Sequence, residues 1–80
     1  MSDLDRQWAN EANKHLKGKT IEEVRYMTED EVSDNMWYKR AIVIHFTDGT
    51  IAYPVMDDEG NDGGAMYFQD DNKTHVIPTL

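Results

Sequence analysis

Residues 38–56 read YKRAIVIHFTDGTIAYPVM, and this stretch decides the fold that we expect. Apolar residues surround a central Asp48-Gly49 pair, which is typical of a two-residue type I′ turn between two antiparallel strands. The stretch therefore predicts a β-hairpin at the centre of the protein.

The register of this hairpin follows if Thr47 and Thr50 face each other across the turn. Side chains alternate between the two faces of a strand, so one face collects large apolar residues. We predict that they form the core: Ile42, Ile44, Phe46, Ile51, Tyr53 and Val55. Pro54 has no N–H for the ladder, so the second strand should break near it.

Two helices and a strand are expected before the hairpin. A capping box at Ser2 and apolar residues at three- and four-residue spacing predict a helix over residues 3–16, which Gly18 ends. Residues 19–27 predict a strand with a bulge that brings Ile21 onto the face of Val24 and Tyr26. A second capping box, Thr28 with Glu31, precedes a short helix over residues 29–36.

After the hairpin, residues 57–64 predict a loop, and residues 65–68 and 75–78 predict short strands that complete the sheet. The expected fold is a single α+β domain over residues 1–80. In it, an N-terminal helix and one short helix pack on a small antiparallel sheet built around a central hairpin.

The chain is short enough that its core should be thin. A domain of 80 residues buries only about 60 to 65% of the surface of its unfolded chain. Small domains compensate with disulfides, a metal or a second subunit, and this chain has no cysteine. We therefore expect a homo-oligomer, with a metal bound by oxygen or imidazole ligands as the other option.

The 16 acidic residues outnumber the 8 Lys and Arg residues and give a formal net charge of −8. This charge repels phosphates, so we expect neither direct nucleic-acid binding nor binding to an anionic membrane. The sequence shows no signal-peptide pattern and no long apolar run, which favours a cytoplasmic location.

The acidic loop is the expected site for a ligand or partner. Its candidate residues are Asp57, Asp58, Glu59, Asn61, Asp62, Gly63 and Gly64. Calcium and magnesium prefer oxygen ligands, and Asp57, Glu59, Asn61 and Asp62 could supply them. No frame of the loop matches an EF-hand. Two alternatives stay open, namely a solvated turn and a concave nest of glycine N–H groups that holds an anion.

Catalytic chemistry has little support in the sequence. Cysteine is absent, the two serines lie near a chain end and in a polar helix, and a small core offers little room for a pocket that shifts a pKa. His15, His45 and His75 lack the short spacing of a zinc site. We therefore expect that the protein is not an enzyme.

Several blocks of the sequence resemble an uncharacterised family of short bacterial and bacteriophage proteins. The blocks are LKGKTIEEVRYM at residues 16–27, TEDE at 28–31, Trp37, DGT at 48–50, Pro54 and DDEGNDGGA at 57–65. The GKT, RYM and DDEGNDGGA parts are the most specific. The resemblance implies a free-standing cytoplasmic domain, with a phage origin as one option and the acidic loop as a defining feature, but no activity.

These observations favour a small acidic interaction or regulatory protein that acts by binding, as a homo-oligomer or on a host protein. One alternative is an oligomer that binds calcium, magnesium or a small ligand through the acidic loop. Another is a DNA-mimic inhibitor, which needs one continuous acidic face. Its candidate residues are Glu29, Asp30, Glu31, Asp57, Asp58, Asp62, Asp70 and Asp71.

Overall fold

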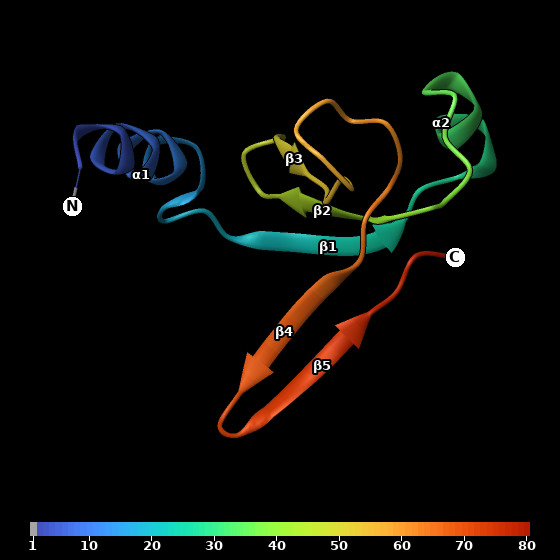
Figure 1. The fold of residues 1–80 in the computed structure, drawn as a ribbon. Coiled ribbons are helices and arrows are strands. Elements are labelled where there is room, and N and C mark those ends of the chain that lie inside the picture. The colour runs from blue at the N-terminus through green and yellow to red at the C-terminus, as the bar shows by residue number, and fades with distance from the viewer. Residues whose placement is uncertain (1) are drawn as a thin grey trace.

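A computed structural model describes residues 2–80 of the chain. The elements are α1 (Asp3–Leu16), β1 (Ile21–Tyr26), α2 (Glu29–Asp34), β2 (Ile42–Phe46), β3 (Ile51–Ala52), β4 (Met66–Asp70) and β5 (Lys73–Ile77) (Figure 1). β1, β2 and β3 form an antiparallel sheet with β2 in the centre, and β4 and β5 form a second sheet of two strands. The mixed α+β class is therefore confirmed.

Both helices begin at the predicted capping boxes. Ser2 exchanges hydrogen bonds with Asp5 at the start of α1, and Thr28 does so with Glu31 at the start of α2. Gly18 has a φ of +78°, the left-handed conformation expected after α1. α2 ends at Asp34, two residues before the predicted end.

Within residues 2–80, neither helix has the length and apolar content that a bilayer crossing requires.

The turn between β2 and β3 contains three residues, so the predicted two-residue type I′ turn is wrong. The Phe46 N–H donates to the Thr50 carbonyl at 3.0 Å, and Gly49 between them has a φ of +88°. A type I′ turn needs a positive φ at Asp48 as well, and Asp48 does not have one. Instead, the Asp48 carboxylate accepts hydrogen bonds from the N–H and the hydroxyl of Thr50, which stabilises the longer turn.

The extra turn residue shifts the hairpin register by one residue. His45 pairs with Ile51, and Ile44 pairs with Ala52. Ile51 therefore shares a face of the sheet with His45, and not with Ile44 as predicted. Ile51, Tyr53 and Val55 are exposed, which contradicts half of the predicted core. Ile42 and Phe46 are buried as predicted, but the main buried cluster contains other residues: Met27, Val32, Trp37, Ala41 and Val43. The expected break is confirmed, because β3 ends at Ala52 before Pro54.

β1 has the predicted bulge. Ile21 lies opposite Phe46 and Val24 opposite Ile44, with the irregularity between Ile21 and Glu23. The bulge places Ile21 and Val24 on one face, as expected.

Lys19 connects the start of β1 to the hairpin turn. Its Nζ lies 3.0 Å from a carboxylate oxygen of Asp48, donates to the Thr50 hydroxyl at 2.7 Å and lies 5.5 Å from the centre of the Phe46 ring. These contacts lower the pKa of Asp48 to about 2, with the hydrogen bonds from Thr50 as the largest cause and the one from Lys19 next. The GKT and DGT blocks of the sequence thus meet in space.

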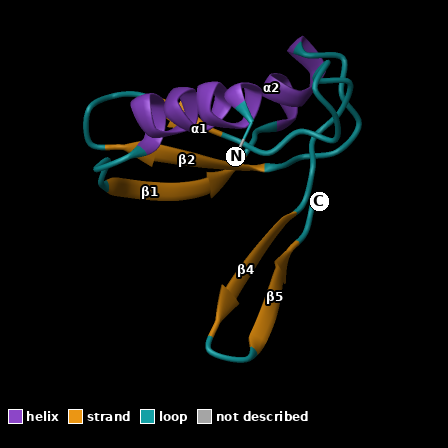
Figure 2. Cartoon of the chain, turned by 60° about the vertical axis from the view of Figure 1, so that its left-hand side comes forward, coloured by secondary structure: helices purple, strands orange, loops and turns teal. Residues whose placement is uncertain are grey.

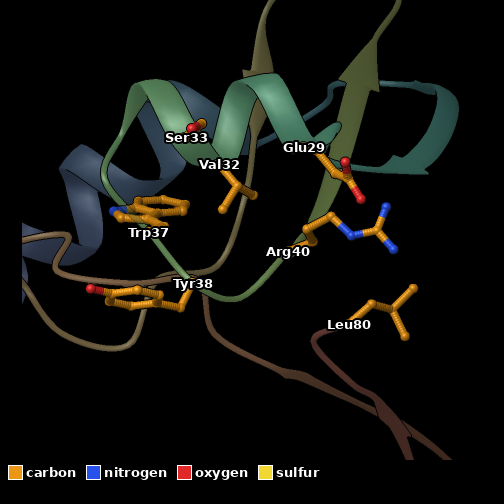
Figure 3. Close-up of a pocket in the computed structure, with 7 residues that line it drawn as sticks. All are labelled: Glu29, Val32, Ser33, Trp37, Tyr38, Arg40 and Leu80. Carbon is orange, nitrogen blue, oxygen red and sulfur yellow. The ribbon is translucent and has the colours of Figure 1, made fainter.

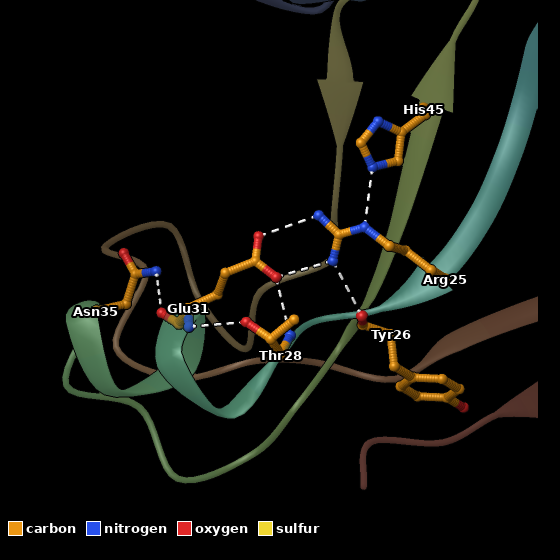
Figure 4. Close-up of polar contacts among 6 residues, drawn as sticks. All are labelled: Arg25, Tyr26, Thr28, Glu31, Asn35 and His45. Carbon is orange, nitrogen blue, oxygen red and sulfur yellow. Dashed lines mark hydrogen bonds and ion pairs between the residues drawn. The ribbon is translucent and has the colours of Figure 1, made fainter.

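Arg25 connects the sheet to α2 (Figure 4). Its guanidinium donates to both carboxylate oxygens of Glu31, at 2.8 and 3.1 Å, and its Nε donates to Nε2 of His45 at 3.1 Å. Because arginine only donates, Nε2 of His45 accepts and the imidazole carries its proton on Nδ1. The Arg25 hydrogen bond and the bond from the Thr28 N–H lower the pKa of Glu31 to about 2.

The last two strands pair with each other and not with the central sheet, which corrects the prediction that they complete it. In Figures 1 and 2, the β4–β5 hairpin projects away from the other elements. β3 is only two residues long, so it offers a further strand little backbone to pair with.

Glu31→Gln should make the free energy of unfolding depend less on pH in the acidic range. The folded-state pKa of about 2 lies below the usual 4.5, so the Glu31 carboxylate contributes stability that is complete above about pH 5 and is lost as the pH falls toward 2. Chemical unfolding of the variant should show a loss of about 1 kcal/mol at neutral pH, because the pair is partly exposed, and a shallower decline toward pH 2. Glu29→Gln, at an exposed position in the same helical turn, is the control and should keep the decline. An unchanged decline in Glu31→Gln would contradict the role of this pair.

Candidate functional site

The predicted acidic loop lies between β3 and β4 and is fastened to the chain at both ends. Val55 and Gly63 form an antiparallel bridge, the Met56 N–H donates to the Asp62 carbonyl at 3.0 Å, and the Gly64 N–H donates to the Pro54 carbonyl at 3.1 Å. The Trp37 indole N–H donates to the Gly60 carbonyl at 2.7 Å. The loop is therefore an ordered part of the fold.

Asp62 is buried, and one of its carboxylate oxygens joins the loop to the segment that contains Tyr38 and Lys39. Oδ1 accepts hydrogen bonds from the N–H groups of Tyr38 at 3.1 Å, Lys39 at 2.9 Å and Gly63 at 2.8 Å. These bonds, that from Lys39 above all, lower the pKa of Asp62. The Asp62 carboxylate thus stabilises the fold through backbone hydrogen bonds.

Asp57 organises the other end of the loop. Its Oδ1 accepts from the N–H groups of Glu59 at 3.0 Å and Asn61 at 3.2 Å, and its Oδ2 accepts from the Asn61 amide at 2.7 Å. The bonds from Asn61 are the main cause of a lowered pKa of Asp57. This arrangement is a local turn closed by side-chain hydrogen bonds.

The four residues predicted as metal ligands do not form a metal site in the structure. The carboxylates of Asp57 and Asp62 face backbone N–H groups, and the Asn61 amide donates to Asp57 and, at 3.4 Å, to Glu59. Across residues 2–80, no three His, Cys, Asp or Glu side chains converge as a metal requires. The geometry therefore favours neither calcium nor magnesium, and Asp58 and Glu59 remain as exposed surface acids.

The glycines of the loop do not form an anion nest. The Gly60 N–H donates to the Asp57 carbonyl at 3.3 Å, while those of Gly63 and Gly64 donate to Asp62 and Pro54. Gly63 serves close packing instead, because a Cβ there would lie 2.6 Å from the Lys39 carbonyl oxygen. All three N–H groups thus have partners within the protein.

The three histidines lie apart, each beside a different residue. His15 is 3.3 Å from Glu11, His75 is 3.3 Å from Asp70, and His45 accepts from Arg25.

A DNA mimic requires one continuous acidic face, and two of its candidate residues do not contribute free charge to such a face. Glu31 pairs with Arg25, and Asp62 is buried.

An open pocket lies between α2 and the C-terminal residues (Figure 3). It is lined by Glu29, Val32, Ser33, Trp37, Tyr38, Arg40 and Leu80. Its volume is about 210 Å³, below the range of about 300 to 1,000 Å³ of most small-molecule sites. Backbone hydrogen bonds between Arg40 and Leu80, both of 2.9 Å, close one side. The pocket is small for a ligand.

The most unusual surface belongs to α1 and the β4–β5 hairpin (residues 66–77), which we call the two arms. The β4–β5 hairpin projects away from the central sheet in Figures 1 and 2, and Figure 1 shows α1 beyond the start of β1. The extensive contacts between elements of residues 2–80 join β1 to β2, β2 to β3, and β4 to β5, and none of them involves α1. The large apolar side chains exposed on the arms are Leu4, Trp8, Leu16, Tyr67, Phe68 and Val76.

Part of this surface could be predicted from the sequence. The three- and four-residue spacing predicts the apolar side of α1. Aromatic and methionine residues are favoured at interfaces, and those at element ends are Met36, Trp37, Met56, Met66 and Tyr67. Met36, Met56 and Tyr67 are exposed, whereas Trp37 is buried in the core. The second face of the hairpin of residues 38–56 is apolar enough for α1 or a second subunit to cover it, and within residues 2–80 α1 makes no extensive contact with its strands.

The chain exposes more surface than a folded protein of its size. Its accessible area is 6498 Å², whereas a compact monomer of 9.3 kDa exposes about 5,000 Å². Its radius of gyration is 14.3 Å, compared with about 11.6 Å for a compact chain of 80 residues. The excess is about 1,500 Å² over the whole chain.

Comparison of the chain with protein-family models, with curated proteins and with solved structures gives no match.

Asp62→Ala should destabilise the fold by about 2 kcal/mol, because it leaves one buried and two partly buried N–H groups without an acceptor. Asp62→Asn keeps an acceptor oxygen and should lose less. Asp58→Asn removes a neighbouring exposed charge and should change stability by less than about 0.5 kcal/mol. Urea unfolding measures all three. Equal losses for Asp58→Asn and Asp62→Ala would show that charge, and not hydrogen bonding, is the cause.

Proposed function

We propose that this chain is a small acidic interaction protein that acts by binding another protein chain through its two arms. The observation that carries this proposal is the set of large apolar side chains exposed on the arms, in a chain whose total exposed surface exceeds that of a compact monomer by about 1,500 Å². Exposed apolar patches mark protein interaction sites.

The stability of the arms supports the same conclusion. An isolated helix of 14 residues is marginal in water, and so is an isolated two-stranded hairpin. Both gain stability when their apolar sides are buried. Trp8 on α1 is 64% exposed and Tyr67 on β4 is 71% exposed, and aromatic residues of this kind contribute much of the energy of protein interfaces.

Binding, and not catalysis, is the activity that we propose. The acidic loop supports the fold through Asp57 and Asp62, and the pocket beside α2 is small. The resemblance to short bacterial and bacteriophage proteins supports a cytoplasmic location, including a host cytoplasm if the chain is phage-encoded. A regulatory role is part of this proposal, with a host protein or a second copy of the chain as the partner.

Photo-crosslinking tests the proposal. Benzoylphenylalanine replaces Trp8 or Tyr67 on the arms, and Tyr38, an aromatic residue that is 92% exposed on the central part of the chain, provides the control position. Irradiation of cells that express the chain should give covalent protein adducts at positions 8 and 67, and few at position 38. Gel electrophoresis measures the adducts. Their absence at both arm positions, or equal amounts at position 38, contradicts binding through the arms.

A further inference from the structure

We infer that the occupant of the two arms is a second copy of this chain. This inference rests on the proposed function and adds the identity of the partner. Charge, area and the composition of the arms each distinguish a second copy from a different protein.

The charge of the chain is distributed unevenly. α1 and its C-cap carry three acids and three bases, so this arm is neutral: Asp3, Asp5, Arg6, Glu11, Lys14 and Lys17. The β4–β5 hairpin carries Asp70, Asp71 and Lys73, a net charge of −1. Residues 18–65 between the arms carry 11 acids and 4 bases, and thus almost all of the net charge of −8.

This distribution fits contact between like chains. Two copies that meet through neutral arms keep their acidic central parts apart, and beyond about 8 Å at physiological salt the repulsion is largely screened. A basic partner would instead be attracted to residues 18–65 and would gain nothing from neutral arms. The arms therefore carry little net charge that would repel a second copy.

The size and composition of the exposed surface are also typical of a homodimer interface. A standard interface buries about 800 Å² per partner, and permanent homodimers bury about 1,000 to 2,500 Å². The excess of about 1,500 Å² lies within the second range. Homodimer interfaces are also more apolar than other interfaces, and the arms expose the apolar residues Leu4, Trp8 and Phe68.

The self-association is tested with purified protein by light scattering over a range of concentrations. The mass should rise from 9.3 kDa toward a whole multiple of it at micromolar concentration. Trp8→Ala should weaken self-association by at least about 30-fold, the loss of an interface anchor of about 2 kcal/mol. A mass of 9.3 kDa at every concentration overturns the inference.

A pair of charge variants identifies the partner. Lys14→Glu and Lys39→Glu change the net charge equally, but Lys14 lies on α1 and Lys39 is an exposed residue of the central part. Lys14→Glu should weaken self-association by roughly fivefold or more, through like-charge repulsion in the interface, and Lys39→Glu should change it little. Circular dichroism checks that α1 stays helical. Equal effects, or tighter association of Lys14→Glu, overturn the inference.

The outcomes for the two proposals are distinguishable. Crosslinks at positions 8 and 67 that contain only this chain support both. Crosslinks at these positions to a different protein, together with a monomeric mass, keep the proposed function and overturn the second copy as partner. Absence of crosslinks at both positions overturns the proposed function itself.

Discussion

The carboxylate of Asp62 is the contact on which the arrangement of this small protein most depends. It accepts hydrogen bonds from the N–H groups of Tyr38 and Lys39, more than 20 residues away, and of the adjacent Gly63, so it holds the acidic loop against the segment that leads from α2 into β2. With a buried core of few side chains, such polar links carry a large share of the fold's specificity. Lys19 with Asp48, and Arg25 with Glu31, act in the same way at the two ends of β1.

These links give a physical meaning to the sequence blocks. GKT meets DGT through Lys19, RYM meets TEDE through Arg25, and Trp37 meets DDEGNDGGA through the Gly60 carbonyl. A set of blocks that looked like a functional signature therefore consists largely of residues that bind one another. Folding explains Asp57 and Asp62 of the loop, and the arms are the better candidates for function.

Local patterns in the sequence predicted much of the secondary structure, whereas contacts between distant residues could not be predicted from the sequence. The capping boxes at Ser2 and Thr28 depend on residues three positions away, so both helix starts could be read directly. The predicted hairpin register was wrong because Asp48-Gly49 fits both a two-residue and a three-residue turn. The two turns shift the second strand by one residue, which moves its side chains to the opposite faces of the sheet. Two of the partners of Asp62, Tyr38 and Lys39, lie more than 20 residues away, and no pattern in the loop identifies them.

The separate positions of the two tryptophans have a spectroscopic consequence. Trp37 lies in the core with its indole N–H bonded to the acidic loop, whereas Trp8 is largely exposed on α1. An indole in water emits at longer wavelength than one in an apolar interior. The red component of the intrinsic fluorescence thus comes from Trp8 and reports on the surroundings of the arm, and the blue component comes from Trp37 and reports on the integrity of the core. One unlabelled chain carries separate optical signals for association and for unfolding.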